Sequence, residues 1–429
     1  MYSTPFPLSP SLWFATAAPA PQTEALSQDH HCDVAVIGGG FAGLSTALHL
    51  TQRDIKTTLL EAREIGFGAS GRNGGQVIPG LKYDPDDMIK KYGTERGQQL
   101  IKFAGATADP VFDLIARHKM DVPLVRNGWI QGAHTQAALA LANQRAEQWG
   151  RHGAPVRYLD QAHTQQLLGT ERYLGGWIDE RAGAVQPLSF VRGLARAAIE
   201  AGARVHTDSP VKSLSLQNGK WHILTNHGAS ITADRVVMCT NGYGGDLWPK
   251  LKTTIIDANS FQIATTPLPD HIKRTILPQG HVCSDTRNLL LYFRLDHEGR
   301  LLMGGRGPFR EPKGEADWAH LERVMHKMFP QVKGQPIAFR WCGRVAITRD
   351  YLPHLHEPAP GLLIDMGCMG RGVGLQTSMG IAMAHYIASG NKLDLPFPIT
   401  EAKSFPLYGL RRLYVNAVVT WYRINDGGV

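Results

Sequence analysis

The chain has 429 residues, which at roughly 150 residues per domain predicts two or three domains and a large buried core. Hydrophobic residues make up 43% and charged residues 19% of the chain, close to the averages of soluble globular proteins, which excludes a disordered or fibrous protein. The formal net charge is +8, but no dense basic run carries interleaved aromatic residues, so we expect no nucleic-acid partner.

The five cysteines form no C-x-x-C pair and leave one over. This pattern predicts reduced thiols in a cytoplasmic protein and argues against structural zinc, so no metal site is expected. No Lys or Arg precedes Arg53, and no apolar run reaches the ~18 residues of a spanning helix. We therefore expect neither a secretory signal nor a transmembrane segment.

Residues 1–30 contain prolines at positions 5, 7, 10, 19 and 21, which prevent a long helix. They predict an extended N-terminal arm, with Trp13 and Phe14 pinning it to the body of the protein.

A βαβ unit of about 30 residues follows the arm. The apolar run Asp33–Ile37 predicts a strand, the glycine turn begins a helix, and a second apolar run ends at Glu61. Gly38 makes the tight turn, Gly40 lets the backbone approach a pyrophosphate, and Gly43 lets the helix pack on the strand. Glu61 is placed to accept from a ribose hydroxyl, which disfavours a 2′-phosphate and leaves NAD or FAD.

A second glycine-rich loop, residues 66–76, follows directly and carries the polar side chains of Ser70, Arg72, Asn73 and Gln76. Here the chain resembles the flavin-dependent oxidoreductases of the D-amino acid oxidase and glycine oxidase superfamily. It is most similar to the γ-glutamylputrescine oxidase-like and L-pipecolate oxidase-like branch, in which G-A-S-G-R-N-G-G-Q is characteristic. The resemblance implies FAD as the cofactor and hydride transfer from a carbon bonded to nitrogen to flavin N5.

Later segments extend the resemblance over roughly residues 10–400: residues 202–211, 233–242, 341–343, 348–353 and 367–374. The amides of the last of these open a helix and suit the negative charge of a reduced flavin near N1 and the C2 carbonyl. The cofactor-binding residues expected on this basis are Gly38, Gly40, Phe41, Ala42, Gly43, Glu61, Ala62, Arg63, Ser70, Gly71, Arg72, Asn73, Gly74, Gly75, Gln76, Val211, Thr240, Asn241, Gly242, Gly343, Gly370, Arg371, Gly372, Val373 and Gly374.

The resemblance implies a Rossmann-like α/β FAD-binding domain interrupted by an α+β substrate domain with a mainly antiparallel sheet. The FAD-binding parts are expected at residues 31–85, 183–245 and 338–400, and the substrate domain at 86–182 and 246–337. Alternating runs at 288–294 and 300–306 predict strands of that sheet. Residues 401–429 are expected to form an amphipathic tail.

Flavin amine oxidation depends on orienting the substrate rather than on strong acid or base groups, so no catalytic side chain is assigned with certainty. An arginine should clamp a substrate carboxylate in a bidentate pair. The substrate-binding residues expected are Tyr292, Arg294, Arg306 and Arg344, with Arg72 and Arg371 as further candidates for the carboxylate. Arg344 is favoured because it directly follows the Trp-x-Gly segment near which relatives place such an arginine.

Two departures from sarcosine oxidase-like relatives matter for the cofactor. Cys342 is about one residue out of register with their flavin-linking cysteine, and Gly374 stands where they carry an oxygen-activating lysine. We therefore expect non-covalent FAD, reoxidised by O2 or by a respiratory-chain acceptor.

Apolar residues recur at helical spacing between Leu410 and Tyr422, with Arg411, Arg412 and Arg423 nearby. This pattern predicts either a helix docked on the protein or an interfacial helix that makes peripheral contact with the inner face of the membrane.

The predicted activity is oxidation of the carbon–nitrogen bond of a small amino or imino acid, L-pipecolate-like, to an imine. The alternative within the class is a γ-glutamylputrescine-type acylated polyamine oxidase. Alternatives from other classes are an NAD-dependent dehydrogenase and a flavin oxidase that acts on modified tRNA.

Overall fold

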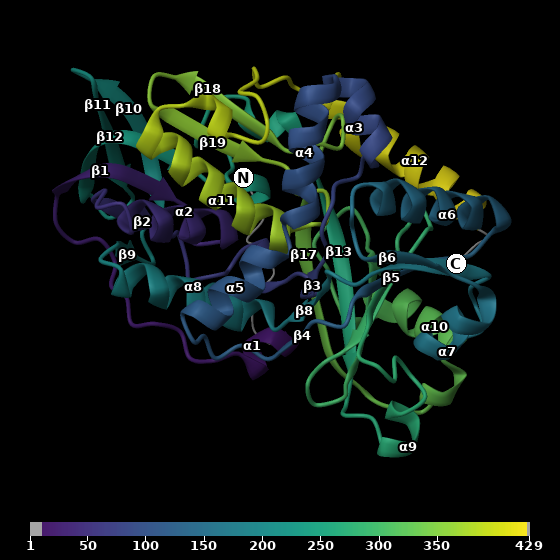
Figure 1. The fold of residues 1–429 in the computed structure, drawn as a ribbon. Helices are drawn as coiled ribbons and strands as arrows, with labels where there is room; N and C mark the ends of the chain where they lie inside the picture. Colours follow the sequence, from purple (N-terminus) through teal and green to yellow (C-terminus); the bar gives the residue numbers. More distant parts are fainter. Residues whose placement is uncertain (1–10, 427–429) are drawn as a thin grey trace.

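The structure is a computed structural model that describes residues 11–426. Its first sheet has eight strands (Figure 1). They are β1 (His30–Ile37), β2 (Thr57–Leu60), β9 (Arg204–His206), β10 (Val211–Gln217), β11 (Lys220–Thr225), β12 (Ser230–Met238), β18 (His354–Ala359) and β19 (Leu362–Met366). Strands β19, β12, β1, β2 and β9 run parallel in that order, while β10 and β11 form an antiparallel meander with β12. This is the Rossmann-like sheet that the glycine turn predicts.

Both faces of this sheet are covered, which explains why its strands are almost continuously apolar. Val34 and Val36 of β1 pack in the core that also contains α2 (Phe41–Thr51), whereas Ala35 and Ile37 pack with Trp221 of the meander on the opposite face. Helix α2 contacts both α8 (Pro187–Glu200) and α11 (Gly372–Ser389). These helices form the layer on which the first glycine turn rests.

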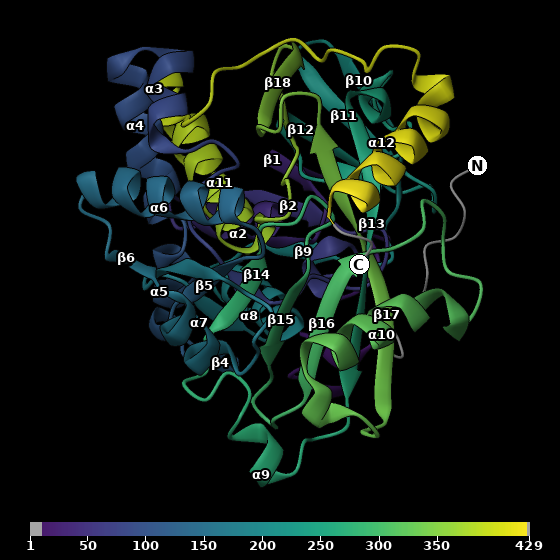
Figure 2. The same ribbon diagram turned by 90° about the vertical axis from the view of Figure 1, so that its right-hand side faces the viewer.

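The second sheet also has eight strands, in the order β17-β13-β16-β15-β14-β5-β7-β6. They are β5 (Trp129–Ala133), β6 (Val156–Leu159), β7 (Gly175–Asp179), β13 (Ile255–Thr265), β14 (Val282–Asp285), β15 (Tyr292–Leu295), β16 (Leu301–Arg306) and β17 (Ile337–Thr348). Every pairing is antiparallel except that of β14 with β5. The long strands β13 and β17 run side by side between the two halves of the molecule (Figures 1 and 2).

Period-two alternation gives this second sheet two different faces. Phe261 and Ile263 of β13 pack in a core with Leu321 and Met325 of α10 (Ala319–Met328). Ser260 and Gln262, one residue along, point into a cavity instead. The face turned toward the first sheet is therefore the polar one.

The remaining elements surround these sheets. The strands β3 (Gln76–Val77), β8 (Gly183–Val185) and β4 (Leu124–Val125) form a small third sheet, in that order. The other helices are α3 (Pro85–Tyr92), α4 (Thr94–Ala106), α5 (Asp109–Arg117), α6 (Gln136–Arg151), α7 (Gln161–Leu168), α9 (Asp270–Lys273) and α12 (Arg411–Asn425).

The predicted domain boundaries need one correction. Residues 338–348 were assigned to the FAD-binding part, but β17 pairs along its whole length with β13 of the second sheet. The reason is that β19 of the first sheet is already paired on both sides, with β12 and β18, whereas the eleven-residue β13 offers the twelve-residue β17 a full-length antiparallel partner. The rest of the domain division stays a prediction.

The predicted N-terminal arm falls partly outside the described residues, which begin at Ser11. Its proline-free interval forms the short helix α1 (Leu12–Thr16), capped by Ser11 Oγ, which accepts from Phe14 N at 3.1 Å. Trp13 is buried, and its Nε1 donates to the Asn73 carbonyl oxygen at 2.7 Å. Phe14 is 40% exposed, so Trp13 and not Phe14 is the main anchor of the arm.

Candidate functional site

The first glycine turn is packed too closely to accept side chains at Gly38 and Gly40. Gly38 has φ +112°, and a Cβ there would lie 2.9 Å from the Cys239 carbonyl oxygen. A Cβ on Gly40 would lie 2.8 Å from Ser70 Oγ, which accepts from the Phe41 amide that begins α2. The backbone at the start of this helix is therefore bare, and its positive dipole end faces the cavity described below.

Glu61 directly follows β2, and backbone amides hold its carboxylate. Its Oε2 accepts from Gly39 N at 2.6 Å, and its Oε1 accepts from Arg63 N at 2.9 Å. Burial raises the pKa of Glu61, and these amide hydrogen bonds oppose the rise. Each oxygen keeps a lone pair, which suits a carboxylate that accepts from ribose hydroxyls.

The polar side chains of the second glycine loop mostly shape the loop itself. Asn73 Oδ1 accepts from Gly75 N at 2.8 Å, and Arg72 Nε donates to the Phe67 carbonyl oxygen at 2.7 Å. Gln76 Nε2 reaches the second sheet and donates to the Cys283 carbonyl oxygen at 2.9 Å. The loop is thus a rigid wall between the sheets.

These segments enclose one cavity of about 1130 Å³ between the two sheets. This volume exceeds the ~300–1,000 Å³ of a drug-sized ligand pocket, as a dinucleotide with a substrate requires. The expected cofactor residues that line it are Gly38, Gly40, Phe41, Ala42, Glu61, Ala62, Arg63, Ser70, Arg72, Asn73, Gly74, Gln76, Val211, Thr240, Asn241, Gly242, Gly343, Gly370, Arg371, Gly372 and Val373.

Four expected cofactor residues do not line the cavity. Gly43 packs α2 on β1, since a Cβ there would lie 2.0 Å from the Gly38 carbonyl oxygen. Gly71 and Gly75 fit against the backbone of Gly66 and Val185 in the same way. Gly374 was expected to contact the flavin, but it packs against the backbone at the end of α4, because its Cβ position lies 2.6 Å from the Thr107 carbonyl oxygen.

Arg294 is the clearest correction among the expected substrate residues. It is only 6% exposed and is absent from the cavity lining. Its Nε and Nη2 each donate at 2.9 Å, to the carbonyl oxygens of Gly74 and Val185, and its guanidinium stacks on Trp13. Arg294 therefore joins the loop, the small sheet and the arm instead of lining the cavity.

The other three expected substrate residues do line the cavity. Tyr292 Oη lies 2.8 Å from Ser260 Oγ, and burial raises the pKa of Tyr292, so it stays a neutral hydroxyl. Arg344 forms an ion pair of 2.6 Å with Glu311 and stacks on Tyr243. Arg306 has no carboxylate within ion-pair distance among residues 11–426.

Several further residues from both sheets and from the tail line the cavity and were not expected there from the sequence. They are Lys82, Trp129, Gln131, Asn259, Ser260, Gln262, Arg287, Arg349, Tyr351, Tyr414, Val418 and Tyr422. The alternation of Ser260 and Gln262 with Phe261 and Ile263 was a usable signal for the sheet residues.

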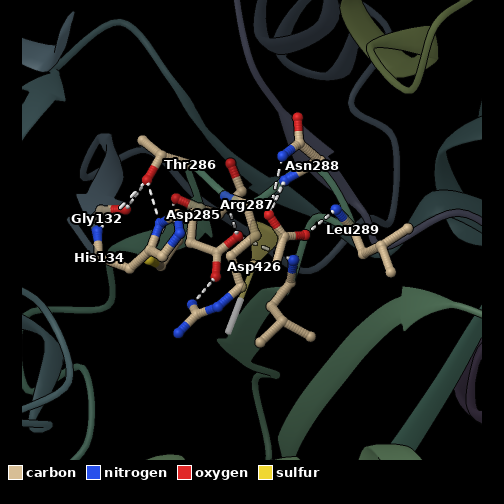
Figure 3. Close-up of polar contacts among 11 residues, drawn as sticks. Gly132, His134, Asp285, Thr286, Arg287, Asn288, Leu289 and Asp426 are labelled. Atoms are coloured by element: carbon tan, nitrogen blue, oxygen red, sulfur yellow. Dashed lines mark hydrogen bonds and ion pairs between the residues drawn. The ribbon is translucent and has the colours of Figure 1, made fainter. Parts of the chain in front are cut away.

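Helix α12 covers part of this cavity, crossing the molecule beside β13 (Figure 2). Its end is fixed by Asp426, whose carboxylate accepts from Asn288 N at 3.0 Å and Leu289 N at 2.7 Å (Figure 3). The adjacent Arg287 pairs with buried Asp285, so the loop that receives the helix is itself fixed. Tyr414, Val418 and Tyr422 face inward, which confirms docking on the protein.

A buried carboxyl, Asp365 of β19, lies beneath the C-terminal loop. Burial raises the pKa of Asp365 to about 7, and its contact with the Gln376 side chain opposes the rise. The unfolded chain loses this proton near pH 4, so stability should fall as pH rises from about 4 to about 7 and then level off.

Asp365→Asn should therefore stabilise the protein at pH 8 by up to about 4 kcal/mol, since three pKa units at about 1.4 kcal/mol each set the upper bound. Urea unfolding of both proteins at pH 4 and pH 8 measures this. The expected gain is present at pH 8 and small at pH 4. A variant that is less stable at pH 8 contradicts it.

The residues fit FAD. The bare turn at Gly38 and Gly40, the carboxylate of Glu61 and the amides that begin α11 supply the donors and acceptor that a flavin dinucleotide needs. Thr240 Oγ1, which is buried at the cavity wall, has no hydrogen-bond partner among the described residues. The fold and this cavity define a dinucleotide-dependent oxidoreductase.

Comparison with known proteins identifies the cofactor. The family model described as FAD dependent oxidoreductase, DAO, matches residues 33–386. The chain therefore belongs to the DAO family of FAD-dependent oxidoreductases, and FAD is its cofactor. This excludes the NAD alternative and confirms the resemblance.

Three relatives illustrate the similarity. The chain is 31% identical to a probable oxidoreductase OrdL of Rhizobium meliloti, over 98% of each chain. It is 30% identical to the gamma-glutamylputrescine oxidoreductase of Escherichia coli, over 94% of this chain and 96% of that one. The crystal structure of glycine oxidase from Geobacillus kaustophilus superposes with a TM-score of 0.73 at 19% identity, covering 87% of this chain and all of that one, which confirms the fold.

No helix among residues 11–426 is long and apolar enough to cross a membrane. No cluster of three or more metal-ligating side chains occurs in this part of the chain.

Proposed function

We propose that the protein oxidises the carbon–nitrogen bond of an amine that carries a carboxylate, with a γ-glutamylputrescine-type compound as the substrate class. The observation that carries this proposal is the charge of the cavity. Glu61, held by the first glycine turn, is the only carboxylate among the described lining residues, whereas Lys82, Arg306, Arg349 and Arg371 are cationic. A free polyamine finds no anionic partner there, but a carboxylate finds several.

The relatives support this choice over a small imino acid. One relative is named a gamma-glutamylputrescine oxidoreductase. The sequence prediction favoured an L-pipecolate-like substrate because of Arg344, and the ion pair with Glu311 removes that particular argument. The cavity volume of about 1130 Å³ also suits a longer substrate.

Bound FAD supplies the acceptor for a hydride from the carbon that carries the nitrogen. The protein's part is to orient the substrate and to keep water out. Trp129, Tyr292 and Tyr422 supply aromatic walls, and α12 covers part of the cavity. Hydride transfer requires the neutral amine, because the nitrogen lone pair drives the loss of hydride from the adjacent carbon.

The test compares kcat/KM with an artificial electron-accepting dye for γ-glutamylputrescine, putrescine and L-pipecolate. We expect γ-glutamylputrescine to exceed putrescine by at least about 100-fold, because an unpaired carboxylate contact costs ~3 kcal/mol. Preference for L-pipecolate would return the assignment to imino acids, and preference for putrescine would contradict the role of the cationic lining.

We also propose that FAD is held without a covalent bond. Cys342 points into the core under the second sheet and is absent from the cavity lining, and burial raises its thiol pKa to about 12. Burial likewise raises the pKa of Cys239 and Cys368, which do line the cavity. Acid precipitation should therefore release all of the yellow cofactor. In the proposed reaction, the electrons pass to O2 or to a respiratory-chain component.

The outer face of α12 supports the proposed peripheral membrane contact. Leu413, Trp421 and Ile424 are between 62% and 69% exposed, on the side away from the cavity. Residues 404–425 contain three arginines and no Asp or Glu. An apolar stripe with neighbouring cations is typical of a helix at an anionic lipid surface.

The FAD-loaded protein should therefore co-sediment with vesicles of phosphatidylglycerol and phosphatidylcholine. The double variant Leu413→Ser/Trp421→Ser should lose most of this binding. Vesicles of phosphatidylcholine alone are the control for charge. Failure of the unaltered protein to sediment, or equal sedimentation of the variant, contradicts the membrane contact.

A further inference from the structure

Lys82 and Arg371 bring two positive charges to the same part of the cavity wall. Lys82 follows the second glycine loop, and Arg371 precedes α11; both line the cavity. Arg371 is fixed there, because its Nη1 donates to the Pro79 carbonyl oxygen at 2.7 Å and its guanidinium lies 5.3 Å from the ring centroid of Trp129. Since Trp129 belongs to β5, this pair lies on the side of the second sheet.

No protein carboxylate compensates these charges. Within residues 11–426, neither Lys82 nor Arg371 forms an ion pair, and the nearby acids are already engaged. Asp84 pairs with Arg145 at 3.0 Å, and Asp179 pairs with Arg181 at 2.6 Å. Lys82 is exposed at the cavity wall and Arg371 is half-buried there, so an anion in the cavity can reach both charges and relieve their mutual repulsion.

Lys82 and Arg306 have different ionisable neighbours. Burial, Arg371 and Arg145 together lower the pKa of Lys82 to about 8. Arg306 instead has Tyr351 and Tyr422 as its ionisable neighbours, which places it under α12. Arg306 therefore lies in a different region of the cavity from Lys82 and Arg371.

We propose that Lys82 and Arg371 form the subsite for the substrate carboxylate. This inference rests on the proposed function for the identity of the substrate, but the anion site itself does not depend on any oxidation. The planar guanidinium of Arg371 can present two donors to a carboxylate, and the Lys82 ammonium adds a third charge-assisted donor. Arg371 is thereby assigned to the substrate as well as to the cofactor loop.

The experiment uses binding rather than turnover. Glutarate, a dicarboxylate without an amine, is titrated into the FAD-loaded protein while the visible flavin spectrum is followed, with neutral glutaramide as the comparison. Lys82→Met is expected to weaken glutarate binding about 10-fold to 100-fold and to leave glutaramide binding unchanged. Lys82→Arg should restore most of the affinity. Lys102→Met, at an exposed position of α4, is the matched control and should change neither.

The pH dependence supplies a second readout. Lys82 loses its proton as pH rises through about 8, whereas burial lowers the pKa of Arg371 only to about 10. Glutarate affinity of the unaltered protein should therefore fall between pH 7 and pH 9. In Lys82→Met this fall should be absent, and in Lys82→Arg it should move to higher pH.

The outcomes separate the two proposals. Glutarate binding that depends on Lys82, in a protein that does not oxidise γ-glutamylputrescine, supports the anion site and rejects the substrate. Loss of glutarate binding in Arg306→Met but not in Lys82→Met overturns the subsite and leaves the proposed function standing. A change in the flavin spectrum of Lys82→Met without a change in glutarate affinity also overturns it, since Lys82 then serves the cofactor.

Discussion

Gly43→Ala is expected to yield protein that does not retain FAD. The added Cβ would lie 2.0 Å from the Gly38 carbonyl oxygen and 3.3 Å from Val36 Cγ1. Val36 belongs to buried β1, and Gly38 lies in the turn that joins β1 to α2, so neither neighbour can move without separating α2 from β1. Since this contact sets the distance between the helix start and the pyrophosphate position, we expect a loss of more than about 3 kcal/mol in stability and no bound flavin.

The measurement is the ratio of flavin to protein absorbance after purification, together with the thermal midpoint. Gly314→Ala is the matched control, since Gly314 has extended backbone and no atom within 4 Å of its Cβ position. The control should keep full flavin content and its midpoint. A Gly43→Ala protein with full flavin content would show that helix packing does not set the cofactor site.

Arg294→Met is expected to destabilise the protein without a selective effect on substrate affinity. The substitution leaves the buried carbonyl oxygens of Gly74 and Val185 without the donors of Arg294 and removes the stacking on Trp13. Hydrogen bonds from charged donors contribute about 1.5–3 kcal/mol each, so a loss of about 3–5 kcal/mol in the free energy of unfolding follows. Methionine keeps the apolar volume of the side chain, which isolates the polar contribution.

Arg306→Met is the comparison, because Arg306 is an arginine of the same sheet that does line the cavity. Urea unfolding and KM are measured for both variants. We expect Arg294→Met to lower stability strongly, and Arg306→Met to act mainly on KM. The reverse pattern, with a raised KM and normal stability in Arg294→Met, would restore Arg294 to substrate binding.

The parts of this site that were predicted from sequence are those with local causes. The turn at Gly38, the carboxylate of Glu61 and the loop around Ser70 lie within one βαβ unit and its continuation, where strand, turn and helix are neighbours along the chain. The Rossmann-like sheet and the mainly antiparallel second sheet followed from the same local patterns, and the structure confirms both.

The substrate side depended on contacts between distant segments. Tyr292 and Arg294 lie on the same face of β15, and the family resemblance led us to expect both near the substrate. Only the docking of Trp13, some 280 residues earlier in the chain, covers Arg294 and removes it from the lining. Likewise, Lys82 lies in irregular backbone, where no periodicity indicates which way a side chain points.

The tail shows the same limit. Helical spacing predicted an amphipathic helix, but both of its faces carry apolar residues. Which face meets the protein is decided by Asp426, which accepts from the backbone of Asn288 and Leu289, and this contact spans 138 residues of sequence (Figure 3). The structure therefore assigns Tyr414, Val418 and Tyr422 to the cavity and leaves Leu413 and Trp421 outside.

The most direct measurement of the central claim is anaerobic mixing of the FAD-loaded protein with γ-glutamylputrescine, followed by the visible flavin spectrum. Absence of O2 isolates the half of the reaction that the cavity performs, whatever the later electron acceptor. We predict bleaching by one equivalent of this substrate, and no bleaching by putrescine at the same concentration. An unbleached flavin with γ-glutamylputrescine, or equal bleaching by putrescine, would contradict a carboxylate-selective amine oxidoreductase.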